Sequence, residues 1–193
     1  MTGNGGGATD PDDADRLRRR VLWAMPTGLY VVGSRSGDRR NLMTCNWVMQ
    51  VATTPRLVAV ALEAASLTRE LIVGGGSFSV NLLARSERNL VRRFVKPADD
   101  VVVDGAGAVT SIRGEPVFEV MDGLPCLSVA VAWLACSVRS VHEWEAGGRP
   151  DGASHVLVVG EVVDAGQTDR LVAPDDDDDA VLSMADTRMN YGG

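Results

Sequence analysis

Cysteine, histidine and aromatic residues are scarce in this chain of 193 residues, and their scarcity excludes several classes of protein. The three cysteines, Cys45, Cys126 and Cys136, are odd in number and match no CxxC or Cys/His spacing, so neither a disulfide framework nor a metal site is expected. A reduced, cytoplasmic protein is the simpler expectation. The most apolar segment, 127–138, is shorter than the roughly 18 residues that cross a bilayer, and the N-terminus lacks the pattern of a signal peptide. We therefore expect no membrane contact.

Positive charge is also lacking, since 26 acidic residues outnumber 19 basic ones and the net charge is -7. Proteins that bind nucleic acid gather Lys and Arg on one face, so no nucleic-acid partner is expected. The chain has neither a GxGxxG motif opening a helix nor a GxxxxGKS/T motif, and the glycine triplet at 74–76 follows its expected helix. His142 lacks the second histidine of an HExxH site. These absences exclude a Rossmann cradle, a P-loop and a zincin.

Length and composition predict one domain with two tails. Residues 1–12 are rich in Gly and Asp and are expected to form a disordered tail. The domain is expected over 13–170, and 171–193 is expected to form a C-terminal acidic segment and tail. The aspartates at 175–179 lack the spacing of a calcium loop and favour a solvated charge run.

Apolar and β-branched runs predict many strands and few helices. Strands are expected at 29–32, 42–51, 57–62, 78–83, 124–141 and 155–163, with a hairpin turn at 36–38 and a boundary at Pro55. Short helices are expected at 13–23, 66–73 and 86–94, and 96–114 is expected to be a surface loop. Because strands follow one another instead of alternating with helices, the pattern favours a mainly β, antiparallel barrel or sandwich.

A polar cluster interrupts one of these apolar runs at Thr44, Cys45, Asn46 and Trp47. The cluster has two interpretations. Its polar residues either face solvent from a half-buried strand or line a ligand site.

Two hydroxyl residues, Ser66 and Thr68, bracket the start of the helix expected at 66–73. Free N–H groups and the helix dipole favour an anion at such a position, and hydroxyls there can add donors to a phosphate. Ordinary capping by Ser66 is the alternative.

Asn81 and His155 are two further polar residues at informative positions. Asn81 lies within an apolar strand and needs a hydrogen-bond partner if it is buried, which is either backbone or ligand. His155 opens the last expected strand beside the loop at 147–152, where it is either at the rim of a pocket or structural.

Taken together, these segments resemble the flavin reductase-like family, the FMN-binding split β-barrel proteins. The resemblance rests on MPTGLYVVGS (25–34), NLMTCNWVMQVATTP (41–55), LVAVALEAASLTRELI (57–72), GSFSVNLL (76–83), the helix ending at Phe94, PCL (125–127) and SHVLVVGEV (154–162). These segments lie in the order and spacing of the family and cover roughly residues 20 to 165.

The resemblance implies an antiparallel Greek-key split β-barrel with short flanking α-helices, which forms a homodimer and binds FMN, less often FAD, near the dimer interface. It implies that Thr44, Cys45, Asn46 and Trp47 lie along the isoalloxazine, largely through backbone groups. It places the phosphate at Ser66 and Thr68 and the flavin near Asn81. His155 is the catalytic candidate, because the matching histidine lies near the flavin ring or the nicotinamide.

The function implied by the resemblance is an NAD(P)H-dependent FMN reductase that transfers a hydride from nicotinamide C4 to flavin N5. NADH or NADPH is the co-substrate, and a flavin-dependent monooxygenase is a candidate partner that receives the reduced flavin. The cofactors supply the reactivity, so no general acid or base is required of the protein. The alternatives are a non-catalytic FMN carrier or sensor, and another split-barrel oxidoreductase using flavin or deazaflavin.

Overall fold

The structure, a computed structural model, describes residues 11–144, 154–172 and 180–187. The strands are β1 (Tyr30–Ser36), β2 (Arg39–Cys45), β3 (Val48–Thr53), β4 (Arg56–Glu63), β5 (Ser77–Leu82), β6 (Val101–Val103), β7 (Val109–Ile112), β8 (Glu115–Val120), β9 (Leu124–Leu127), β10 (Ala132–Glu143) and β11 (His155–Gln167). The helices are α1 (Pro11–Trp23), α2 (Leu67–Gly75) and α3 (Asp169–Val172), with short 3-10 segments η1 (Arg85–Glu87), η2 (Leu90–Phe94) and η4 (Met184–Asp186). No helix in the described ranges is long and apolar enough to cross a membrane. The predicted loop at 147–152, the aspartate run and residues 1–10 lie outside these ranges.

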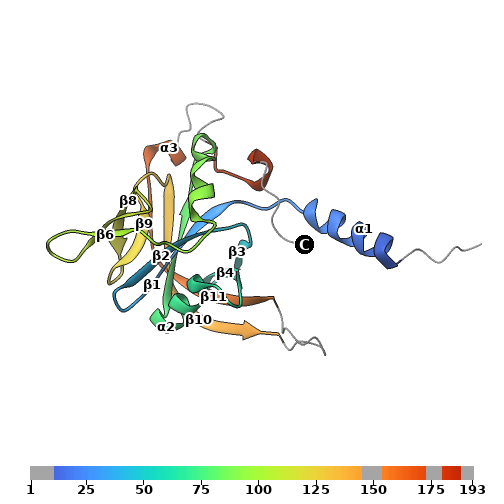
Figure 1. Cartoon of the computed structure of the whole chain (residues 1–193), viewed down its shortest axis with the longest axis horizontal. Helices are drawn as coiled ribbons and strands as arrows, with labels where there is room; N and C mark the ends of the chain where they lie inside the picture. The colour runs from blue at the N-terminus through green and yellow to red at the C-terminus, as the bar shows by residue number, and fades with distance from the viewer. Residues whose placement is uncertain (1–10, 145–153, 173–179, 188–193) are drawn as a thin grey trace, which may run out of the picture.

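Two antiparallel sheets form the body of the molecule (Figure 1). The larger sheet has seven strands in the order β2-β1-β5-β10-β11-β4-β3, and the smaller has four in the order β6-β7-β8-β9. The prediction of a mainly β, antiparallel fold with short flanking helices is confirmed.

The seven-stranded sheet curls so that its two edges meet at one corner. Strands β2 and β3 stand at opposite ends of the strand order, yet only Asn46 and Trp47 separate them in the chain. Three Cα steps span at most about 11 Å, so the edge strands must approach each other here. The prediction of a single strand over 42–51 is therefore wrong, because the chain passes from one edge of the sheet to the other within an apolar run.

Two hydrophobic clusters form the core. One lies within the curled sheet and includes Val60, Leu62 and Phe78. The other lies between that sheet, the smaller sheet and η2, and it includes Phe94 and Leu182. Leu182 lies in the segment assigned from sequence to the C-terminal tail, 171–193, and residues 180–187 of that segment pack on the domain.

Residues 180–187 cross the start of β1 and the end of β5. The Leu182 N–H donates to the Leu83 carbonyl at 2.8 Å, and the Leu29 N–H donates to the Leu182 carbonyl at 3.2 Å. Isolated bridges join Gly28 to Ser183 and Ala84 to Val181. We refer to 180–187 below as the C-terminal strap.

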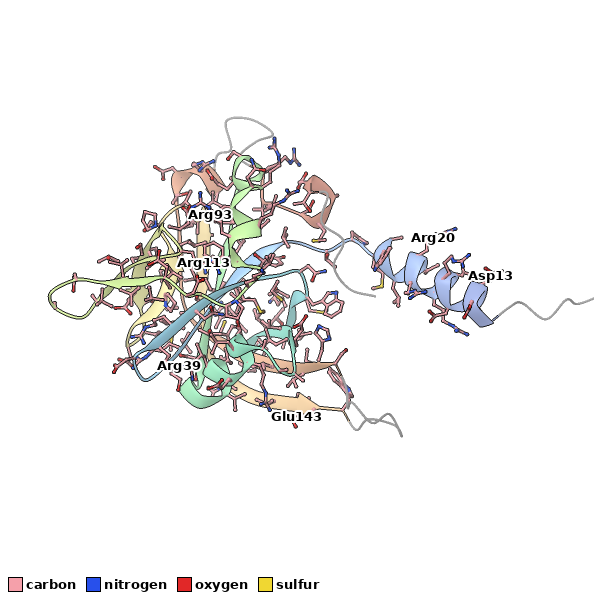
Figure 2. The ribbon with its side chains drawn as sticks, viewed as in Figure 1. Asp13, Arg20, Arg39, Arg93, Arg113 and Glu143 are labelled. Atoms are coloured by element: carbon pink, nitrogen blue, oxygen red, sulfur yellow. The ribbon has the colours of Figure 1, made fainter. Side chains whose placement is uncertain are left out.

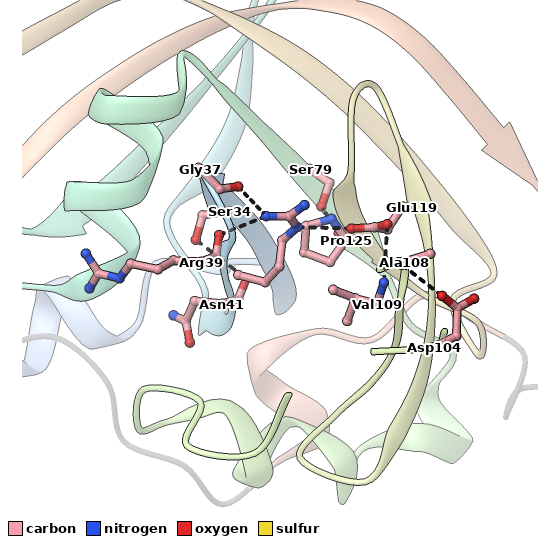
Figure 3. Close-up of polar contacts among 11 residues, drawn as sticks. Ser34, Gly37, Arg39, Asn41, Ser79, Asp104, Ala108, Val109, Glu119 and Pro125 are labelled. Carbon is pink, nitrogen blue, oxygen red and sulfur yellow. Dashed lines mark hydrogen bonds and ion pairs between the residues drawn. The ribbon is translucent and has the colours of Figure 1, made fainter. Parts of the chain in front are cut away.

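Polar contacts join the two sheets (Figure 3). Arg40 Nε pairs with Glu119 Oε1 at 3.0 Å, and the Ser79 hydroxyl donates to the Pro125 carbonyl at 2.6 Å. A Cβ at Gly33 would collide with the Ser79 hydroxyl and the Pro125 carbonyl, so only glycine lets the sheets approach this closely.

Three further expectations differ from the structure. The predicted loop at 96–114 contains β6 and β7, whose residues become strands by pairing with each other and with β8. The predicted helix at 86–94 is replaced by η1 and η2. The predicted strand at 124–141 is divided into β9 and β10, which belong to different sheets.

Helix α1 forms as predicted and projects away from the β body (Figures 1 and 2). Its apolar residues stay exposed, including Leu17 at 58%, Val21 at 60% and Trp23 at 53%. The packing that normally stabilises an amphipathic helix is thus absent for α1 within the described part of this subunit.

Candidate functional site

The corner between β2 and β3 presents unsatisfied donors at Asn46. The Trp47 carbonyl accepts a hydrogen bond from the Ala61 N–H at 3.0 Å, which ties the corner to β4. The Trp47 backbone also bonds to the Cys45 thiol, whereas neither the N–H nor the side-chain amide of Asn46 has a hydrogen-bond partner among the described residues. The Trp47 side chain is 38% exposed, so an apolar ring face lies beside free donors.

Thr44 and Cys45 precede the corner with their side chains buried. The Thr44 hydroxyl donates to the Val91 carbonyl at 2.5 Å, and the Cys45 thiol donates to the Ala61 carbonyl at 3.6 Å. Burial raises the pKa of the Cys45 thiol to about 12, although a hydrogen bond with the Trp47 backbone acts in the opposite direction. These side chains hold the corner in place and leave its backbone to face solvent.

His155 lies beside Trp47, far away in sequence. Their rings meet edge to face, with centroids 4.7 Å apart and an interplanar angle of 64°. His155 opens β11 opposite Glu63, the last residue of β4, and its Nδ1 lies 2.9 Å from the Ser154 hydroxyl. The structure therefore unites two of the residues selected from sequence.

The start of α2 follows directly from the end of β4 and completes this region. The Ser66 N–H donates to the Glu63 carbonyl at 3.0 Å, and the Ser66 hydroxyl caps the helix by accepting from the Arg69 N–H at 3.2 Å. The N–H groups of Leu67 and Thr68 have no partner among the residues that the structure describes. Both the expected cap and the free donors of a helix start are present.

Thr68 differs from Ser66 in its surroundings. Its side chain is 1% exposed, and its hydroxyl accepts a hydrogen bond from Asn41 Nδ2 at 2.8 Å. Asn41 Oδ1 in turn accepts from the Ala98 N–H at 2.8 Å. The Thr68 hydroxyl thus joins α2 to β2 and to the loop at 98, while its backbone N–H belongs to the free helix start.

Asn81 is fully buried and its amide is occupied by backbone partners. Its Nδ2 donates to the Val31 carbonyl at 2.9 Å, and its Oδ1 accepts from the Leu127 N–H at 2.8 Å. Of the two partners considered from sequence, the structure shows backbone. The amide holds β5 to β1 and β9.

Arg69 was not selected from sequence, although it lies in the first turn of α2. Its Nη2 forms an ion pair with Glu143 at the end of β10, where Figure 2 labels Glu143, and its Nε is buried with no hydrogen-bond partner. A cation in the first turn opposes the helix dipole, and this was the signal available in the sequence. An anion at the helix start would compensate both effects.

The donor set of this region fits a phosphate group beside a flat heteroaromatic ring. The free N–H groups of Leu67 and Thr68, the Ser66 hydroxyl and the unpartnered Arg69 Nε match a phosphate. The exposed Trp47 ring and the free donors of the corner match a flat heteroaromatic ring with polar edges. Both sets lie around the end of β4, which connects them through Ala61, Glu63 and Ser66.

Comparison with known proteins gives the class of this chain. Residues 22–191 match the flavin reductase like domain, so the chain belongs to that family, as the resemblance indicated. A flavin reductase (NADH) from Kitasatospora aureofaciens is 28% identical over 156 residues, which cover 80% of this chain and 73% of that protein. The solved styrene monooxygenase flavin reductase from Pseudomonas putida superposes with a TM-score of 0.60 at 26% identity, covering 78% of this chain and 86% of the other.

Some relatives are much longer than this chain. A curated relative from Rhizobium meliloti (strain 1021) is 26% identical over 148 residues, which cover 76% of this chain but only 42% of that protein. The chain thus spans less than half of the length of that relative. The family domain therefore occurs within larger proteins as well as in chains of similar length.

Proposed function

We propose that this protein is an NAD(P)H-dependent flavin reductase that uses FMN and releases or passes on reduced flavin. The observation that carries the proposal is the meeting of the corner at Asn46 and Trp47, the start of α2 and His155 around one end of β4. The residues around this end of β4 would hold a flavin, which would supply at N5 an acceptor for the hydride, with its two electrons, that leaves nicotinamide C4.

The residues around the end of β4 bind and orient the rings. The N–H group and the side-chain amide of Asn46 donate to the polar edge of the ring system, and the Trp47 side chain covers part of its apolar surface. Thr44 and Cys45 fix the position of these donors from the buried side. Holding two reactants face to face in this way removes much of the entropic barrier to transfer.

The phosphate is bound at the start of α2 in this proposal. The Ser66 hydroxyl, the N–H groups of Leu67 and Thr68, and Arg69 are the ligands, supported by the bond from Asn41 to Thr68. Asn81 acts indirectly by fixing β5 against β1 and β9, next to the strand that leads to the corner.

His155 positions the nicotinamide or flavin ring in this proposal. Its ring packs edge to face on Trp47, and Ser154 orients its Nδ1.

We also propose that the protein forms a homodimer. The exposed apolar residues of α1 and the outer face of β3, where Met49 is 64% and Val51 is 46% exposed, are available to a second copy. Apolar surface of this kind marks interaction sites. Sedimentation of the full chain tests the dimer, and a monomer at micromolar concentration contradicts it. A cytosolic location and delivery of reduced flavin to a monooxygenase stay predictions.

The visible spectrum of the purified protein, recorded with added FMN before and after NADH or NADPH, tests the proposed function. We expect flavin absorbance to bleach at a rate that depends on the protein. A protein that binds FMN but leaves it oxidised would indicate a carrier or sensor. A protein that neither binds flavin nor oxidises either nicotinamide would refute the proposal.

A further inference from the structure

A basic cleft lies apart from the candidate flavin site, between the η1–η2 segment and the C-terminal strap. Its volume is about 270 Å³, and it is lined by Arg88, Asn89, Arg92, Asp186 and Thr187. This volume is below the ~300–1,000 Å³ of pockets that enclose a whole drug-sized ligand, so the cleft suits one part of a larger molecule.

The carboxylate in this cleft, Asp186, already has partners within the protein. Asp186 accepts hydrogen bonds from the Ser183 N–H at 2.8 Å and the Ser183 hydroxyl at 2.7 Å, and it pairs with Arg85 Nε at 2.9 Å. Burial alone would raise the pKa of Asp186, but the Ser183 hydrogen bonds and the Arg85 charge lower it overall. The Asp186 charge is therefore balanced by Arg85.

The two remaining arginines have no carboxylate partner in the described part of the chain. Arg88 Nη1 makes a long contact of 3.4 Å with the Arg85 carbonyl, and Arg92 forms no ion pair among the described residues. Their neighbour Arg93 differs, because it pairs with Glu115 at 2.6 Å. Arg88 and Arg92 thus give the cleft two uncompensated positive charges in a protein whose net charge is -7.

The cleft is connected to the candidate flavin site through β2. Val91, between the two cleft arginines, accepts the hydrogen bond from Thr44, which leads directly into the corner at Asn46 and Trp47. Helix α2, with the proposed FMN phosphate site, lies on the other side of the body from the green η1–η2 segment (Figure 1). The molecule therefore has two separate places for an anion, one more than FMN uses.

We propose that the cleft binds the phosphate groups on the adenosine half of a dinucleotide. Guanidinium groups bind phosphate oxygens in a bidentate manner, and the Asn89 amide adds a donor and an acceptor for the ribose or the base. The dinucleotides that fit a flavin reductase are NADH, NADPH and FAD, and this identification rests on the proposed function. The binding of adenosine phosphates to the cleft is independent of the proposed function.

Calorimetric titration of the full chain with ADP and with adenosine 2′,5′-bisphosphate tests the cleft directly. We expect the wild-type protein to bind at least one of them and the R88Q/R92Q variant to bind it at least tenfold more weakly. The matched control is R18Q/R20Q, which removes the same charge from α1 and should leave binding unchanged. Wild-type protein that binds neither nucleotide, or equal binding by R88Q/R92Q, overturns the proposal.

A charge-preserving variant, R88K/R92K, separates the loss of a guanidinium from damage to the fold. We expect its melting temperature to equal that of wild type and its nucleotide affinity to lie between those of wild type and R88Q/R92Q. Two results together would overturn the proposal: R88K/R92K binds nucleotide as weakly as R88Q/R92Q, and R88Q/R92Q melts several degrees below wild type. The loss of binding would then be due to unfolding.

Steady-state assays of R88Q/R92Q then distinguish the dinucleotides. A raised KM for NADPH alone assigns the cleft to the 2′-phosphate of NADPH. A raised KM for both NADH and NADPH assigns it to the diphosphate that they share. A raised Kd for FAD but not for FMN assigns it to FAD. Unchanged values for all four overturn the assignment to a dinucleotide. Wild-type protein that binds ADP but oxidises no nicotinamide with added flavin refutes the proposed function and leaves the cleft supported.

Discussion

Polar residues interrupt apolar strands at two places, in the polar row of β5 (Ser79 and Asn81) and at the corner between β2 and β3. The two places differ in whether their polar atoms are hydrogen-bonded within the protein. In the row, the Ser79 hydroxyl and both ends of the Asn81 amide are buried and bonded to protein. At the corner, the N–H group and the side-chain amide of Asn46 lack partners among the described residues. Buried polar groups must be bonded internally, whereas exposed unbonded ones are available to a ligand. The row therefore serves stability, and the corner is suited to binding.

Asn81→Ala is expected to have the largest effect on stability. The substitution removes the bond to the Val31 carbonyl and leaves the buried Leu127 N–H without a partner. We expect a loss of about 2–4 kcal/mol in the free energy of unfolding, measured with urea. Asn46→Ala is the matched control and should cost less than about 0.5 kcal/mol. Equal losses for the two variants would remove the distinction between row and corner.

Flavin binding is expected to show the opposite order, with a large effect of a substitution at the corner, Trp47→Ala. Loss of the ring that covers the ligand should weaken FMN binding about tenfold, which is about 1.4 kcal/mol. The control is Phe118→Ala, since Phe118 is 37% exposed on β8 of the smaller sheet and packs against Trp133. Fluorescence titration measures both, and a similar loss for Phe118→Ala would argue against a ring site at the corner.

Ser66→Ala is expected to have a smaller effect, divided between helix capping and phosphate binding. Loss of the cap should cost about 1 kcal/mol of stability, whereas Ser66→Gly should cost only a few tenths. Both variants remove the hydroxyl, so both should weaken FMN binding while leaving riboflavin binding nearly unchanged. FMN affinity equal to wild type in Ser66→Gly would place the phosphate elsewhere.

Glu143→Gln is expected to change stability by less than about 0.5 kcal/mol, because the Glu143 side chain is 59% exposed and its ion pair with Arg69 is screened. Freed from this partner, Arg69 should bind the FMN phosphate at least as tightly as before. Weaker FMN binding by Glu143→Gln would show that the ion pair is needed to aim Arg69.

The smallest expected effect concerns the cysteines: at neutral pH the native protein should show no reaction of its thiols. Burial raises the pKa of Cys45 and Cys136 to about 12 and that of Cys126 to about 11, so almost no thiolate is present at pH 8. Ellman's reagent should label no cysteine in the native protein and three after denaturation. Because each pKa is raised in the folded state, stability should fall as the pH rises above about 9. Rapid labelling of the native protein would contradict this burial.

Local patterns were sufficient wherever a residue and its neighbours in sequence decide the structure. The helix cap at Ser66, the hairpin turn at Gly37 and the amphipathic pattern of α1 all follow from short-range chemistry, and all were predicted. The strands of the small sheet were missed because Val101–Val103 has no strand pattern of its own and depends on pairing with β7.

The candidate site was predicted less completely, because the sequence named residues but not the direction of their side chains. It selected Ser66 and Thr68 together, and packing against Asn41 buries only Thr68. It did not select Arg69, whose partner Glu143 is distant in sequence.

The sequence by itself determined that this is a mainly β protein of the flavin reductase like domain family, because alternating apolar patterns, turn residues and ordered motifs are properties of neighbouring residues. Only the tertiary structure decided which polar groups remain available. The approach of the two sheet edges at Asn46 and Trp47, the contact of Trp47 with His155 and the burial of Asn81 all depend on strands that meet from distant parts of the chain. Whether a polar atom is bonded or free is decided by these long-range contacts, which no local pattern encodes.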